Sequence, residues 1–221
     1  MRISQIQVRL YQVRFEILLI SLLSVFALNL FFNTDYYTGV FQIFTLAFQF
    51  FAGANLFFQR NKVFIWIVSC LGLLTLTIRI LNVNTIIPYA NVISFFYLCL
   101  FASISYEVFR EMYKAEVVNR KIVYAAVCGI LLLGYCGFFI FSAIEYFTPG
   151  SFYGISSGSD GMNDLFYYSF ISVMTVGYGD ITPITWSAKN ATIIVNIVSY
   201  VYSLIVVSII VAQFTSYNRR R

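Results

Sequence analysis

Six long apolar stretches constrain the fold of this chain more than any other feature of its sequence. They are Phe15–Phe32, Val40–Phe58, Val63–Leu81, Tyr89–Ser105, Ile122–Ile144 and Lys189–Phe214. Each is close to the roughly 20 residues that an α-helix needs to cross an apolar bilayer core about 30 Å thick. Backbone groups find no water in lipid, so such segments must be helical. The sequence therefore predicts an all-α integral membrane protein with six transmembrane helices.

Composition excludes the competing classes of protein. Hydrophobic residues make up 60% of the chain and charged residues only 10%, whereas soluble domains carry about 25% charged residues. A soluble domain and a disordered chain are therefore both excluded. The chain contains no His, which removes the usual catalytic base and the commonest metal ligand. With no nucleophile–base pair, metal-ligand cluster or nucleotide loop either, we expect no enzymatic activity and no organic cofactor.

The distribution of Lys and Arg predicts the orientation in the membrane. With the N-terminus placed in the cytoplasm, twelve of the 14 basic residues lie on the cytoplasmic side, and only Arg79 and Lys189 lie toward the outside. We therefore expect a multi-pass protein of the cell membrane with cytoplasmic N- and C-termini. The net charge of +5 then reflects this topology, and no nucleic-acid partner is expected.

The loop between the last two stretches contains the most informative motif. It reads Thr175-Val176-Gly177-Tyr178-Gly179-Asp180. Gly177 and Gly179 permit positive φ without steric cost, so that successive carbonyls can face one side instead of alternating as they do in a strand. We expect Val176 and Tyr178 to point into surrounding protein, and Thr175 to add a hydroxyl. A row of carbonyl oxygens can coordinate a dehydrated cation without a fixed charge that would trap it.

A short helix is predicted just before this motif, from Asn163 to Met174. Asn163 or Asp164 can accept hydrogen bonds at its N-terminus, and its C-terminal end directs partial negative charge toward the motif. Tyr167 and Tyr168 can pack behind the motif. Non-helical backbone at membrane depth must be buried or line a water-filled path. Helix and motif together therefore predict a re-entrant pore loop.

The motif and its flanks resemble the selectivity filter of tetrameric potassium channels. Residues 122–221 resemble the pore domain of that superfamily, with outer helix, pore helix, filter and inner helix. Residues 1–121 then form an N-terminal interfacial helix, a four-helix membrane domain and a linker helix. By helix count the whole chain resembles the six-helix, voltage-gated-like members. One loop supplies a quarter of each carbonyl ring, so the functional unit is expected to be a homotetramer.

The resemblance assigns roles to individual residues. It implies a passive, potassium-selective channel in which K⁺ binds at Thr175, Val176, Gly177 and Tyr178, with Gly179 completing the filter. Residues expected to support the filter are Asp180, Tyr167, Tyr168 and Met174. The Tyr167 hydroxyl is the candidate partner of Asp180. Candidates for the cavity and inner gate are Ser199, Tyr200, Ser203, Leu204, Val207, Ser208 and Val211. Ser199 replaces the hinge glycine common in the family, so less bending is expected there.

The fourth stretch departs from the voltage-gated pattern. Voltage sensors of this superfamily carry Arg or Lys at every third position, whereas Tyr89–Ser105 contains neither. Moving one charge across 100 mV is worth about 2.3 kcal/mol, and steep gating uses 3–4 charges per subunit. Arg79 offers at most one. We therefore expect weak or absent voltage dependence.

Two amphipathic segments flank the four-helix domain. Met1–Arg14 predicts an interfacial helix on the inner leaflet, the alternative being a partly ordered basic tail. Tyr106–Lys121 predicts a linker helix that presses on the inner ends of the pore helices, the alternative being a solvated connector. Anionic lipid is an expected partner at the cytoplasmic face, where the three arginines at 219–221 each contribute about 1 kcal/mol near a charged leaflet.

Three other functions stay open. A cation channel of weak selectivity would keep the same fold. The membrane subunit of a potassium uptake system usually carries four filter-like loops in one chain, whereas this chain carries one. A structural membrane protein with a filter that no longer conducts differs only in the absence of ion flux.

Overall fold

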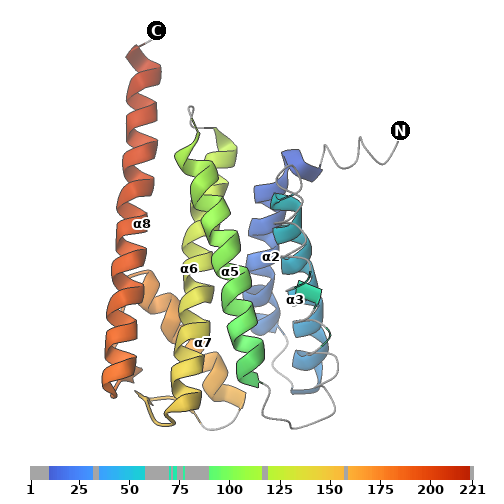
Figure 1. Cartoon of the computed structure of the whole chain (residues 1–221), viewed down its shortest axis with the longest axis vertical. Helices are drawn as coiled ribbons and strands as arrows, with labels where there is room; N and C mark the ends of the chain where they lie inside the picture. Colours follow the sequence, from blue (N-terminus) through green and yellow to red (C-terminus); the bar gives the residue numbers. More distant parts are fainter. Residues whose placement is uncertain are drawn as a thin grey trace.

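The computed structural model describes residues 10–31, 35–57, 70, 72–73, 77, 90–115, 119–156 and 159–219. Within these residues the fold is almost entirely α-helical. The elements are α2 (Arg14–Phe31), α3 (Asp35–Leu56), α5 (Ala90–Tyr113), α6 (Arg120–Phe147), β1 (Phe152–Tyr153), α7 (Ser159–Val173), β2 (Thr182–Pro183) and α8 (Trp186–Arg219). The long helices run side by side, and the shorter α7 is inclined across one end of the bundle (Figure 1).

Three of the described helices are long and apolar enough to cross a membrane. They are Arg14–Phe31, Arg120–Phe147 and Trp186–Ala212. α3 contains a shorter apolar segment, Phe44–Leu56. These helices confirm an all-α membrane protein. Most of the predicted third span, Val63–Leu81, and most of the predicted N-terminal interfacial helix lie outside the described residues.

α5 and α6 share the segment that the sequence predicts as a linker helix. α5 continues without a break through Ser105 to Tyr113, and α6 already begins at Arg120. In the described part of the linker helix predicted at Tyr106–Lys121, the residues up to Tyr113 are helical as a continuation of α5. The segment 105–113 contains no Gly or Pro, and its buried residues extend the apolar stripe of α5, so nothing interrupts the helix. That stripe is Leu100, Phe101, Ile104, Val108 and Met112.

α6 is the central helix of the bundle and contacts α2, α5, α7 and α8. Aromatic rings dominate the contact with α5: Phe101 stacks on Tyr135 at 4.8 Å, and Tyr97 stacks on Phe139 at 5.4 Å between ring centroids. Lipid tails are as apolar as these side chains, so close van der Waals packing holds such helices together. The apolar cluster around α6 joins residues of both predicted domains.

Glycines of α6 let α7 and α8 approach closely. A Cβ atom built on Gly129 would lie 1.9 Å from the hydroxyl of Tyr202 on α8, and one on Gly134 would lie 2.4 Å from the Phe170 ring on α7. At such distances the facing ring would have to shift, so glycine allows both crossings without displacing Tyr202 or Phe170. Small residues at helix contacts are typical of membrane bundles.

Candidate functional site

The loop after α7 begins by folding back onto the end of that helix. The carbonyl of Ile171 accepts hydrogen bonds from the backbone N–H of Val176 at 2.9 Å and of Gly177 at 3.3 Å. The N–H of Thr175 donates to the carbonyl of Ser172 at 3.0 Å. These bonds use carbonyls that a helix end leaves without intrahelical partners. They hold the start of the loop directly at the negative end of the α7 dipole.

Positive φ then recurs at every second residue of the loop. The φ angles are 57° at Thr175, 54° at Gly177 and 82° at Gly179, while Val176 and Tyr178 lie outside the positive region. Gly177 and Gly179 thus adopt the conformation that the sequence predicts. Thr175 was not expected to do so, because a left-handed conformation costs an L-residue about 1–2 kcal/mol. This alternation of φ is the backbone pattern that the sequence analysis expects for carbonyls that face one side.

The side chains of the loop find no cover within a single chain. Val176 is 50% exposed and Tyr178 is 72% exposed, so the protein predicted to surround them is not supplied by this chain. Cβ atoms built on Gly177 and Gly179 would meet no atom within 4 Å. Glycine is therefore required at these two positions for its φ angle and not for space.

Tyr167 lies near Asp180, its candidate partner. The Asp180 carboxylate, as a hydrogen-bond acceptor and as a negative charge, raises the pKa of the Tyr167 hydroxyl. Asp180 Oδ1 also accepts a hydrogen bond from the N–H of Ile181 at 3.0 Å. The two residues bring α7 close to the residue that follows the Tyr178-Gly179 end of the loop.

We expect Tyr167→Phe to shorten the single-channel open time severalfold while leaving ion selectivity nearly unchanged. The substitution removes the hydroxyl that Asp180 influences but keeps the ring. Single-channel open times would measure the effect. Tyr153→Phe is the matched control, because Tyr153 is an exposed tyrosine of β1 outside the loop. Equal open times in Tyr167→Phe and in the control would contradict the pairing.

Tyr168 holds α7 in place instead of contacting the side chain of Tyr178. Its hydroxyl lies 3.0 Å from Thr192 Oγ1 on α8. Its ring contacts Phe141 of α6 and Phe152 of β1, at 5.1 and 5.3 Å between centroids. Among the described residues, it makes no ring contact with Tyr178. Its effect on the loop is therefore indirect, through the position of α7.

Two side-chain carboxylates order the loop between α6 and α7, and the sequence analysis did not predict this role for them. The Glu145 carboxylate accepts hydrogen bonds at 2.6–3.2 Å from the backbone N–H groups of Gly150, Ser151 and Phe152. Asp164 accepts one from the N–H of Ser156 at 2.7 Å. Asp164 therefore lies inside α7 and orders the preceding loop, whereas the sequence predicted the helix to start at Asn163. β1, which precedes α7, and β2, which follows the loop, pair antiparallel.

The inner helix α8 turns one side to α6 and leaves the rest exposed. Val195, Ser199, Tyr202 and Val206 are buried, and the Tyr202 hydroxyl donates to the carbonyl of Ala126 on α6 at 3.1 Å. Ser199 is 2% exposed and donates to the Val195 carbonyl. Its assignment to the cavity is therefore wrong, since it lies on the buried side of α8.

The other cavity and gate candidates are more accessible. Ser203 is half-buried, and its hydroxyl donates to the Ser199 carbonyl at 3.0 Å. The exposed candidates are Tyr200, Leu204, Val207, Ser208 and Val211. Most of them recur every three or four residues, so they share one side of the helix. Met174, at the end of α7, is also exposed.

Comparison with known proteins identifies this C-terminal region as similar to ion channels. Residues 133–216 match the ion channel family model; this segment contains α7, the loop that follows it and most of α8. The chain is also 32% identical over 108 residues to the probable potassium channel protein 2 of Methanocaldococcus jannaschii. That alignment covers 46% of this chain and 27% of the relative, so the chain spans about a quarter of the relative's length. No solved structure matches the chain. Both similarities indicate a channel and not an enzyme.

Proposed function

We propose that this chain forms a potassium-selective channel as a homotetramer. The observation that carries the proposal is the alternation of positive φ at Thr175, Gly177 and Gly179 in an exposed loop at the end of α7. In such a loop the carbonyls can replace the hydration shell of K⁺. The K⁺ sites would lie at Thr175, Val176, Gly177 and Tyr178. The match to the ion channel family and the name of the relative support the same function.

Four copies are needed because one chain supplies one loop. The exposed Val176 and Tyr178 would be covered by neighbouring subunits around a fourfold axis. α8 also supports assembly, since only 22% of its most apolar 18-residue stretch is buried within the chain. Its exposed side with Tyr200, Leu204 and Val207 would face the cavity. Large exposed apolar surfaces of this kind mark contacts with protein or lipid.

The membrane arrangement proposed is six spans with a re-entrant α7. The 15 residues of α7 rise about 22 Å, less than the roughly 30 Å of the apolar core. α7 and the loop after it would therefore enter and leave the membrane on the same side, packed between α6 and α8. Both termini would lie in the cytoplasm, by the distribution of basic residues. The short connection between α5 and α6 favours packing of the first helices against the pore of the same subunit.

Voltage dependence is proposed to be weak. α5 carries no Lys or Arg before Arg110, which lies in its last turn. The Arg110 guanidinium is 3.3 Å from the carboxylate of Glu107 in the preceding turn. No row of basic side chains in α5 is therefore available to move through the membrane field.

The test is the reversal potential of the purified protein in planar bilayers, with K⁺ on one side and Na⁺ on the other. We expect reversal near the K⁺ equilibrium potential and similar open probability across voltage steps of 100 mV. Robust current that reverses near zero would favour the weakly selective cation channel. An intact tetramer without current would favour the non-conducting membrane protein.

A further inference from the structure

The buried hydroxyl of Tyr202 joins three helices at one point. Tyr202 lies on α8 and is 8% exposed, and its hydroxyl donates to the carbonyl of Ala126 on α6 at 3.1 Å. The same oxygen lies 3.4 Å from Sδ of Met112 on α5. A buried tyrosine hydroxyl usually has a hydrogen-bond partner, and here the partner is the backbone of another helix.

The recess around this hydroxyl is shaped to receive it. A Cβ atom built on Gly129 of α6 would lie 1.9 Å from the Tyr202 hydroxyl, so the absence of a side chain there makes room for it. Met112 and Ala126 are buried, and the ring of Phe109 on α5 lies 6.2 Å from the Tyr202 ring between centroids. A carbonyl oxygen has two lone pairs, so Ala126 can accept this bond in addition to one within α6.

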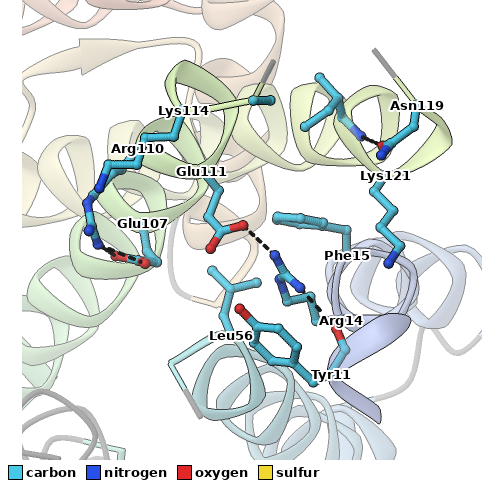
Figure 2. Close-up of a pocket in the computed structure, with 12 residues that line it drawn as sticks. Tyr11, Arg14, Phe15, Leu56, Glu107, Arg110, Glu111, Lys114, Asn119 and Lys121 are labelled. Atoms are coloured by element: carbon cyan, nitrogen blue, oxygen red, sulfur yellow. Dashed lines mark hydrogen bonds and ion pairs between the residues drawn. The ribbon is translucent and has the colours of Figure 1, made fainter. Parts of the chain in front are cut away.

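The end of α5 that meets Tyr202 is itself held in place. Glu111, next to Met112 in the sequence, pairs with Arg14 at the start of α2 (Figure 2). The guanidinium of Arg14 also lies 4.0 Å from the centroid of the Tyr11 ring and donates to the Tyr11 carbonyl at 3.1 Å. Tyr202 therefore joins α8 both to the backbone of α6 and to a fixed end of α5.

The section of α8 around Tyr202 is easier to bend than the rest of the helix. α8 contains neither Gly nor Pro, but the hydroxyl of Ser199 donates to the Val195 carbonyl at 2.8 Å and that of Ser203 to the Ser199 carbonyl at 3.0 Å. Such bonds compete with the backbone bonds of the helix and favour bending. Tyr202 lies between the two serines, so its hydrogen bond restrains this section directly.

The hydrogen bond of Tyr202 also fixes the opposite side of α8. Residues two positions apart are separated by about 200° around a helix, so Tyr200 and Leu204 lie opposite Tyr202. Both are exposed, and in the proposed tetramer their side of α8 faces the cavity. α6 then lies behind α8, and a bond to α6 holds Tyr200 and Leu204 away from the fourfold axis.

We propose that Tyr202 is a positioning residue for ion conduction, whose hydroxyl holds α8 against α6 and thereby keeps the cavity wide. The inference rests on the proposed tetrameric channel. Without the hydroxyl, the section between Ser199 and Ser203 bends toward the axis, and Leu204 narrows the passage. The loop after α7 makes no part of this contact, so ion selectivity does not depend on it.

The test is single-channel recording of the purified protein in planar bilayers. We expect Tyr202→Phe, which removes the hydroxyl and keeps the ring, to lower the open probability by about fivefold or more, since one buried hydrogen bond is worth about fivefold in an equilibrium. Gly129→Ala displaces the hydroxyl and should act in the same direction. Tyr113→Phe is the matched control, because Tyr113 is an exposed tyrosine next to Met112.

Two further readouts separate positioning from a general loss of stability. A merely structural role would reduce the number of channels but not the open probability of each, and the reversal potential between K⁺ and Na⁺ should stay unchanged. Backbone hydrogen exchange of residues 196–208, measured by mass spectrometry in detergent, requires no current. We expect this exchange to be severalfold faster in Tyr202→Phe and unchanged in Tyr113→Phe.

The outcomes distinguish this inference from the proposed function. An unchanged or raised open probability in Tyr202→Phe, or an equal decrease in Tyr113→Phe, overturns the positioning role. Unchanged hydrogen exchange in Tyr202→Phe overturns the restraint of α8 itself. Faster exchange in Tyr202→Phe, together with no K⁺-selective current in the unsubstituted protein, overturns the proposed channel and supports the restraint.

Discussion

Replacing Gly179 with alanine is expected to remove most of the discrimination between K⁺ and Na⁺. Gly179 has φ of 82°, where an L-residue costs about 1–2 kcal/mol. In a tetramer four copies would bear this cost, about 4–8 kcal/mol in all. A hundredfold preference for one ion corresponds to about 2.7 kcal/mol. The strain therefore exceeds the free energy of discrimination between the two ions. The loop should relieve the strain by changing its backbone conformation, and the discrimination should be lost.

The measurement is again the reversal potential between K⁺ and Na⁺, which should move from the K⁺ equilibrium potential toward zero. Gly150→Ala is a closely matched control. Gly150 has φ of 80°, and its added Cβ would likewise meet no atom within 4 Å. It lies in the outer loop, so it introduces the same local strain away from the filter. Unchanged selectivity in Gly179→Ala, or equal loss in Gly150→Ala, would refute the assignment of the filter.

The second large effect is expected for Gly134→Ala, which should destabilise the packing of α7 on α6. The added Cβ would lie 2.4 Å from the Phe170 ring. That ring cannot easily move, because it contacts Phe26, Tyr135 and Phe166 at 4.8–5.6 Å between centroids. Overpacking of a filled core costs about 1–3 kcal/mol per site. We expect a lower thermal midpoint and a smaller fraction of intact tetramer.

A double variant tests whether this contact is the cause. Phe170→Leu removes the ring that the new methyl group would meet, so Gly134→Ala combined with Phe170→Leu should cost less than the sum of the two single changes. Thermal unfolding in detergent provides all four values. Additive effects would show that Gly134 and Phe170 do not interact, and would contradict the close approach of α6 and α7.

The long apolar helices were the most predictable part of the fold. Ile122–Ile144 became α6, from Arg120 to Phe147, and Lys189–Phe214 became α8, from Trp186 to Arg219. In both cases the observed helix is longer than the apolar stretch, because polar residues at the ends continue the helix outside lipid. Hydropathy therefore predicts which segment crosses the membrane better than it predicts where the helix ends.

The cavity role predicted for Ser199 failed because the sequence does not show which side of a helix faces a neighbouring helix. Ser199 has the spacing of a cavity residue, yet it is turned toward the packed side of α8. Spacing along one helix groups residues into sides, but it does not say which side the adjacent helix covers. The missed left-handed Thr175 has another cause: its φ follows from the backbone hydrogen bonds at the end of α7 and opposes its own preference.

The order of residues alone specifies the long apolar helices and the two glycines of positive φ in the loop after α7, because hydropathy and the freedom to adopt positive φ belong to individual segments and residues. The tertiary structure decides which distant residues meet. Tyr202 reaches the backbone of Ala126, and Arg14 pairs with Glu111, 97 residues away. Such contacts depend on how several helices pack at once. A single chain also leaves Tyr178 exposed, since covering it takes more surface than one chain provides.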